Sequence, residues 1–113
     1  MRFLLAFLLL CIAPAARAHA ILMDSQPPVR GSVHAGTVAV AFRYNSRVDA
    51  RRSRLLLIRA DKSEVVLPIL PDSPADQLLA RADLQPGDYT VRWQVLAVDG
   101  HITRGDVPFS VTP

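Results

Sequence analysis

The chain has 113 residues, 13 basic and 10 acidic side chains, a formal net charge of +3 and a single cysteine. This length fits one domain and is short for a multi-domain enzyme. One cysteine excludes an internal disulfide, a four-cysteine zinc site and a CxxC redox motif. The isoelectric point of 9.8 suits a nucleic-acid-binding protein, and the 50% of apolar residues suits a membrane protein. Both readings depend on which residues remain in the mature chain.

Residues 1–18 have the pattern of a secretory signal peptide. Arg2 supplies a positive start, residues 3–13 are all apolar, and Ala16-Arg17-Ala18 offers a small-residue cleavage site. The alternative is a transmembrane helix, but such a helix needs about 20 apolar residues. We therefore expect cleavage after Ala18 and an extracytoplasmic location, which the family resemblance described below narrows to the periplasm.

Cleavage there would leave residues 19–113, a domain of 95 residues with a net charge of +1 and no cysteine. A domain of this size can fold on its hydrophobic core alone. No second apolar segment in it approaches the length of a membrane span. Six arginines lie between Arg43 and Arg59, with Tyr44 as the one aromatic residue among them. We interpret them as a solvated surface, and we expect no nucleic-acid partner.

Short apolar segments recur along the mature chain with turn residues between them. They are residues 37–43, 55–58, 65–67, 88–98 and 107–111. Alternation of apolar and polar residues indicates half-buried strands. Their spacing predicts an all-β domain, a Greek-key β-sandwich of about seven strands. Residues 76–83 fit either one helical turn or a short strand.

Two aromatic residues have predicted packing roles. Pro86-Gly87-Asp88 is a turn signal, and Tyr89 then enters a strand, as at the tyrosine corner of immunoglobulin-like sandwiches. Trp93, on the same strand, is predicted to be the central core aromatic.

Two separate elements carry candidate metal ligands. Signal cleavage would make His19 the N-terminal residue, whose α-amine and ring nitrogen can chelate one transition metal ion. Asp99-Gly100-His101 follows the longest predicted strand. Asp99 and His101 are two residues apart, so in extended backbone they project to the same side and can share a metal ion. Each element also has an ordinary interpretation, an arbitrary mature N-terminus and a solvated Asp-Gly turn.

Together these elements offer an amine, two imidazoles and a carboxylate. Such nitrogen and oxygen donors suit tetragonal Cu(II), with zinc as the alternative. The mature chain has no thiolate, and Met23 is its single thioether. An amine titrates near roughly 8 and an imidazole near roughly 6.5, so we expect copper affinity to rise with pH across that range.

These residues resemble the CopC-type periplasmic copper-resistance proteins, over essentially the whole mature chain. The matching positions are His19-Ala20, Leu22, Ser25, Pro27, Val38-x-Val40-x-Phe42, Leu84-x-Pro86-Gly87-x-Tyr89-x-Val91-x-Trp93, Asp99-Gly100-His101, Gly105 and Phe109-x-Val111. The resemblance implies a cupredoxin- or immunoglobulin-like sandwich that binds Cu(II) through His19, Asp99 and His101. This ligand set coincides with the one proposed from the residues themselves.

The sequence departs from the family pattern in two places. Some members carry a Met-rich loop that binds Cu(I), whereas this chain has no methionine after Met23. A second copper site is therefore not expected. His34 lies outside the family motif, in a segment rich in glycine and serine. We interpret it as a solvated loop residue, with an auxiliary ligand role as the alternative.

The leading functional hypothesis is a non-enzymatic carrier or buffer that binds one Cu(II). The resemblance suggests a CopD-type membrane copper transporter as its partner, with the direction of transfer left open. One alternative is a copper-dependent oxygenase with a histidine-brace-like site. A second alternative is a metal-free adhesion or interaction domain, because fold alone does not settle function.

Overall fold

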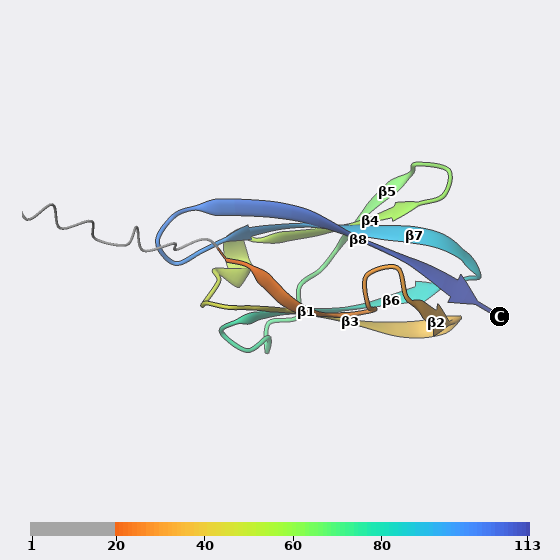
Figure 1. The fold of residues 1–113 in the computed structure, drawn as a ribbon, viewed down its shortest axis with the longest axis horizontal. Helices are drawn as coiled ribbons and strands as arrows, with labels where there is room; N and C mark the ends of the chain where they lie inside the picture. The colour runs from red at the N-terminus through yellow and green to blue at the C-terminus, as the bar shows by residue number, and fades with distance from the viewer. Residues whose placement is uncertain (1–19) are drawn as a thin grey trace, which may run out of the picture.

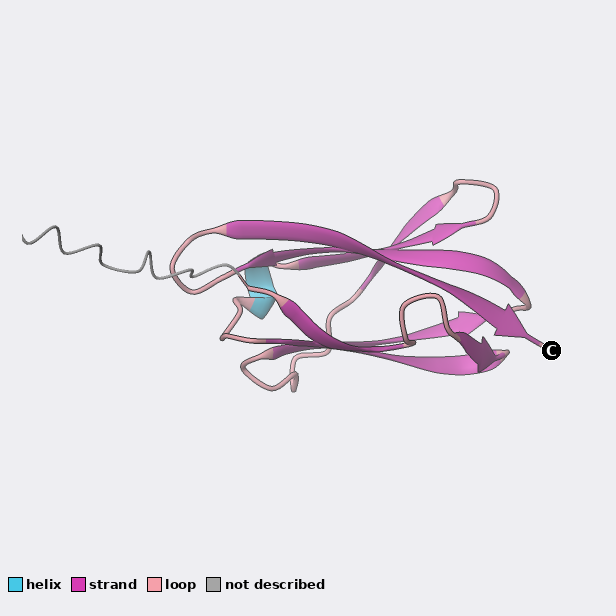
Figure 2. Ribbon diagram, viewed as in Figure 1, coloured by secondary structure: helices cyan, strands magenta, loops and turns pink. Residues whose placement is uncertain are grey.

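The computed structural model describes residues 20–113, which form strands and one short 3-10 helix (Figures 1 and 2). In chain order the elements are β1 (Leu22–Gln26), β2 (Ser32–His34), β3 (Gly36–Tyr44), η1 (Ala50–Arg52), β4 (Arg54–Arg59), β5 (Glu64–Leu67), β6 (Gln77–Leu84), β7 (Gly87–Leu96) and β8 (Ile102–Thr112). Residues 1–19, with the expected signal peptide and His19, lie outside the described residues.

The strands form two sheets, which confirms the predicted β-sandwich. One sheet has the order β1-β3-β6 and the other has the order β2-β8-β7-β4-β5. Neighbouring strands are antiparallel except for β2 and β8, which are parallel. Figure 1 shows the two layers, with the β7–β8 turn and the start of β1 at one end of the long axis. The C-terminus and β2 lie at the opposite end.

The core lies between the sheets and follows the period-two pattern of the sequence. In β3, Val38, Val40 and Phe42 are buried, and in β7, Val91, Trp93 and Val95 are buried. The intervening side chains face outward because successive strand residues point to opposite faces. Apart from the aromatic residues Tyr44 and Trp93, no side chain with a polar group between residues 20 and 113 belongs to a fully buried residue, so the His, Asp, Glu, Lys and Arg side chains of this region lie at or near the surface.

The tyrosine corner and the core tryptophan are both confirmed. The hydroxyl of Tyr89 donates a hydrogen bond of 2.8 Å to the carbonyl of Gln85. Gly87 has a φ of +152°, which its lack of a Cβ permits. Trp93 is 6% exposed and meets the ring of Tyr44 edge-on, with 5.3 Å between ring centroids.

Several predicted boundaries are wrong in detail. The strand expected over residues 88–98 ends at Leu96, and the last strand begins at Ile102 instead of Val107. Residues 77–84 form β6 and not a helical turn, because they pair with β3 over eight positions. The described residues contain eight strands, close to the predicted number of about seven, and β1 and β2 lie outside the predicted segments.

All six arginines between Arg43 and Arg59 are exposed, as expected for a solvated surface. Arg43 pairs with Asp24 at 3.1 Å and Arg52 lies 3.8 Å from Asp49. Such exposed ion pairs contribute little to stability. Within residues 20–113, no helix is long and apolar enough to cross a membrane.

Candidate metal centre

The predicted Asp-Gly-His site lies in the tight turn between β7 and β8. The amide of Gly100 donates to the carbonyl of Ala97 at 2.9 Å, and the amide of Ala97 donates to the carbonyl of His101 at 2.8 Å. Gly100 has a φ of +93°, a conformation that other residues adopt only at a cost. The backbone from 98 to 100 is therefore a turn, and the extended backbone predicted between Asp99 and His101 is wrong.

The turn nevertheless brings the two predicted ligands into contact. Nδ1 of His101 lies 2.7 Å from Oδ2 of Asp99, and the backbone amide of His101 donates to Oδ1 of Asp99 at 3.1 Å. An ionised carboxylate can only accept hydrogen bonds, so in this pair Nδ1 carries the proton. The side chain of Asp99 is 28% exposed and that of His101 is 62% exposed, so the pair is open to solvent.

The same contacts set the charge of the carboxylate. The hydrogen bond from the His101 side chain, followed by the one from its backbone, holds the pKa of Asp99 below its ordinary value. Asp99 is therefore ionised at neutral pH and presents a negative charge next to an imidazole.

The start of the described chain lies at the same end of the sandwich as this turn. The amide of Ile21 donates to Oδ1 of Asn45 at 2.7 Å, and the amide of Asn45 donates to the carbonyl of Ile21 at 3.0 Å. Three residues further on, Val48 forms an isolated bridge with Ala97, which belongs to the β7–β8 turn. Ala20, which follows His19 in the sequence, is completely buried. The chain thus enters the fold at the end of the sandwich that carries the Asp99–His101 pair.

Buried polar atoms accompany this end of the core. The hydroxyls of Tyr44, Ser46 and Thr103 and the indole Nε1 of Trp93 are buried and make no hydrogen bond with any residue between 20 and 113. Burial raises the pKa of the Tyr44 phenol far above its ordinary value, so it stays protonated. Tyr44 continues the Val38-Val40-Phe42 alternation of β3 into the core, beyond the segment 37–43 that was predicted as a strand.

Within residues 20–113, no group of three or more His, Cys, Asp or Glu side chains is arranged to hold a metal ion. Asp99 and His101 supply two donors, and the third predicted ligand, His19, is outside the described residues. A complete site at this turn therefore needs donors from outside residues 20–113.

His34 does not lie near this site. It belongs to β2 and pairs with Thr112, so its predicted place in a loop is wrong. Its Nδ1 lies 3.5 Å from the hydroxyl of Thr112. Thr112 is ten residues along β8 from Ile102, which corresponds to about 30 Å of extended strand. His34 and His101 of one molecule therefore cannot share an ion.

Comparison with known proteins identifies the family to which the chain belongs. The CopC domain family model matches residues 22–112. The chain belongs to the CopC domain family. Protein YobA of Escherichia coli K12 is 31% identical to this CopC domain over 104 residues, which cover 88% of the chain and 84% of YobA. Protein YobA of Shigella flexneri matches equally well.

Solved structures of CopC proteins share the fold. CopC from Methylosinus trichosporium OB3b has a TM-score of 0.75 and 28% identity, covering 84% of this chain and 95% of that protein. PcoC, a methionine-rich copper resistance protein from Escherichia coli, has a TM-score of 0.66 and 20% identity, covering 83% of this chain and 99% of PcoC. The likeness to PcoC concerns the fold alone.

Proposed function

We propose that this CopC-domain protein binds one Cu(II) at the β7–β8 turn, through His19, Asp99 and His101. The observation that carries the proposal is the contact between Asp99 and His101 at the end of the sandwich where the chain enters the fold. The match of the CopC domain family model over residues 22–112 supports the same proposal. The protein would carry or buffer copper in the periplasm after removal of residues 1–18.

The donor set favours Cu(II) over Cu(I). With His19 as the first residue, its α-amine and imidazole would add two nitrogens to the Asp99–His101 pair, giving the nitrogen and oxygen set that Cu(II) prefers. Cu(I) prefers thiolate and thioether ligands. After residue 18 the sequence offers no cysteine and only Met23.

The spacing within the pair also suits a square plane. Two cis ligands with bonds of about 2.0 Å are about 2.8 Å apart. Nδ1 of His101 and Oδ2 of Asp99 are 2.7 Å apart. Cu(II) would take the place of the proton that the two atoms share, with both side chains turning so that their lone pairs converge on the ion. Because copper and protons compete for these donors, its affinity should rise with pH from about 6 to about 8.

We infer that the site transports copper and does not turn over a substrate. A carboxylate in the fourth equatorial position leaves no strong open position for oxygen activation. A CopD-type membrane transporter is the proposed partner, and this proposal leaves the direction of transfer open. Oxidised oligosaccharides formed by the copper-loaded protein with a reductant would contradict the non-enzymatic role.

The test compares Cu(II) binding by the chain that begins at His19 with binding by the same chain carrying one extra alanine before His19. The extension removes the free α-amine from the chelate, so we expect affinity to fall by at least about 100-fold and the EPR parameters to change. His101→Ala should also lose affinity, and His34→Ala, at the far end, should bind copper as the parent does. Equal affinity of the extended chain would overturn the proposed ligand set.

A further inference from the structure

A second candidate site lies on the outer face of the five-stranded sheet, away from the β7–β8 turn. Ile58, Thr90 and Pro108 are adjacent in register on β4, β7 and β8 and line a shallow pocket of about 320 Å³. Thr90 is six residues, or about 20 Å, along β7 from Leu96, where β7 ends and the turn that carries Asp99 and His101 begins. We call this the basic pocket, because Arg30, Arg59 and Lys62 also line it.

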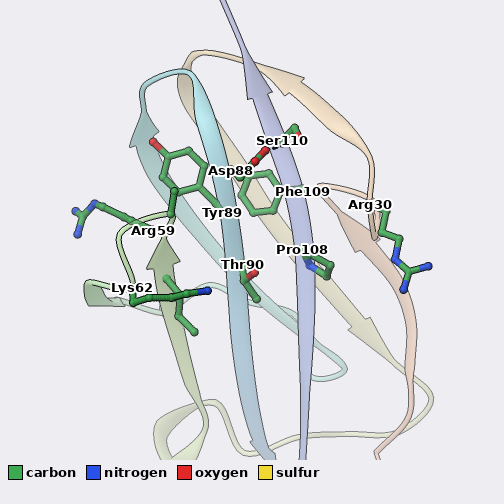
Figure 3. Close-up of a pocket in the computed structure, with 11 residues that line it drawn as sticks. Arg30, Arg59, Lys62, Asp88, Tyr89, Thr90, Pro108, Phe109 and Ser110 are labelled. Atoms are coloured by element: carbon green, nitrogen blue, oxygen red, sulfur yellow. Dashed lines mark hydrogen bonds between the residues drawn. The ribbon is translucent and has the colours of Figure 1, made fainter.

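The three cations approach the basic pocket from three sides. Figure 3 shows Lys62 extended across the pocket with its amine toward Thr90, while Arg59 and Arg30 lie at opposite margins with guanidinium groups directed outward. Within residues 20–113, no carboxylate oxygen lies within 4.0 Å of a charged nitrogen of these three residues.

The carboxylates of this region have other partners. Asp88, which lines the pocket, accepts a hydrogen bond from the hydroxyl of Ser110 at 2.9 Å. Asp61, in the β4–β5 turn, accepts one from the amide of Ser63 at 2.9 Å. The guanidinium of Arg59 contacts the hydroxyl of Ser63 at 3.3 Å. These hydrogen bonds leave the carboxylates charged, and Arg59 helps to lower the pKa of Asp61. The pocket lining still carries three cations against the single carboxylate of Asp88.

Two of the cations occupy backbone positions that are costly for them. Among residues 20–113, Arg30 and Lys62 are the only non-glycine residues with positive φ, at +59° and +71°. Glycine or asparagine adopts this conformation more easily than arginine or lysine. Both positions are fixed to neighbouring backbone, since the amide of Arg30 donates to Pro108 and that of Lys62 donates to Arg59. The two positions place the amine of Lys62 over the basic pocket and Arg30 at its margin, at a cost in backbone conformation.

We propose that the basic pocket binds the phosphate group of an anionic phospholipid headgroup and so holds the protein against a membrane surface. All three cations are exposed, so a single phosphate in solution would be held weakly. A lipid surface presents many phosphates, and each basic residue near it adds to the attraction. Val66 on neighbouring β5 pairs with Leu56, two residues from Ile58 on the same face, and at 56% exposure it offers apolar contact beside the charges.

With the basic pocket against a membrane, the proposed copper site would stay accessible. The pocket and the β7–β8 turn lie toward opposite ends of β7 and β8. The inference does not depend on copper binding. Variants of the basic pocket should load Cu(II) as the parent does, so failure of one proposal is distinguishable from failure of the other.

The test is cosedimentation of the purified protein with vesicles of 30% phosphatidylglycerol in phosphatidylcholine, compared with pure phosphatidylcholine. We expect binding to the anionic vesicles, weakened by salt, and a loss of about fivefold for each cation removed. The double variant Arg30→Asn/Lys62→Asn should therefore bind about 25-fold more weakly. Asparagine tolerates positive φ, so the thermal midpoint of this variant should be equal to that of the parent or higher.

The matched control is Arg47→Gln/Arg81→Gln, which removes two exposed cations outside the pocket and should change binding by less than about twofold. Equal losses in the two double variants would show general charge attraction and overturn the site. Unchanged binding in the asparagine variant would overturn it as well. A separate NMR titration with inorganic phosphate tests whether the pocket binds free phosphate instead of a lipid headgroup. If phosphate shifts the amide resonances of Thr90 and Ser110 while anionic vesicles do not bind, the lipid assignment is wrong.

Discussion

Two turns, one toward each end of the five-stranded sheet, use the same backbone arrangement for different chemistry. In the β7–β8 turn, Oδ1 of Asp99 accepts from the amide of His101, and the residue between them has a φ of +93°. In the β4–β5 turn, Oδ1 of Asp61 accepts from the amide of Ser63, and the residue between them has a φ of +71°. The aspartate forms an Asx turn in both, with the next residue in the left-handed region.

The difference lies in the two other residues of each turn. The first turn has glycine at the left-handed position and histidine after it, so an imidazole meets the carboxylate at 2.7 Å. The second has lysine at that position and serine after it, so a cation extends over the sheet and the carboxylate has a hydroxyl as its neighbour. The backbone motif thus holds the aspartate in place, and the side chains around it distinguish the proposed copper ligand pair from the proposed anion-binding surface.

The largest expected effect comes from breaking the sheet that joins the two turns. A Cβ on Gly105 of β8 would lie 2.4 Å from Cζ2 of Trp93, which is buried in the core. Since the indole has little room to move, Gly105→Ala should lower the free energy of unfolding by roughly 3 kcal/mol. Urea denaturation measures this loss. A change of less than about 1 kcal/mol would show that the indole of Trp93 shifts to accommodate the added methyl group at little cost.

The next effect separates the two aspartates. Asp99→Asn keeps an oxygen that can accept from the His101 amide but removes the charged ligand, so Cu(II) affinity should fall by about 100-fold with the turn preserved. Asp61→Asn makes the same change in the other turn and should leave copper affinity unaltered. Competition titration with a chelator of known affinity measures both. Equal affinities of the two variants would remove Asp99 from the ligand set.

Contacts between residues close in the chain, such as those within these turns, could be predicted from the sequence. Contacts between distant segments could not. Asp99 and His101 are two residues apart, so their proximity follows from short-range geometry, although the prediction of extended backbone between them was wrong. The alternation of Val38, Val40 and Phe42 likewise records burial directly. The ligand role of His19 stays a prediction, because it lies outside the described residues.

Elements defined by pairing were harder to predict. All five residues of β1 are exposed or only partly buried, and β2 has three residues, so neither shows an apolar face. The start of β8 was missed because Gly105 and Thr103 point inward where an apolar residue is expected, and Trp93 fills the space above Gly105. The basic pocket combines Arg30 with two residues about thirty positions away, which no local pattern reveals.

The smallest predicted effect concerns the electrostatics of the β4–β5 turn. The Ser63 side chain is the main cause that holds the pKa of Asp61 below its ordinary value of 3.8. A carboxyl with a lowered pKa in the folded state adds stability above pH about 4, and that stability is lost as the pH falls through the folded pKa. Ser63→Ala should raise the pKa of Asp61 toward 3.8. The stability that the ionised carboxylate adds should then be smaller.

An NMR titration of the Asp61 carboxyl measures this shift, with Ser110→Ala as a control at a hydroxyl that bonds Asp88 instead. An unchanged pKa in Ser63→Ala would show that the backbone amides and the charge of Arg59 hold the pKa of Asp61 low without the Ser63 hydroxyl. The two turns would then differ in a further respect. In the β7–β8 turn the pKa of Asp99 would depend mainly on the side chain of His101. In the β4–β5 turn the pKa of Asp61 would not depend on the side chain of Ser63.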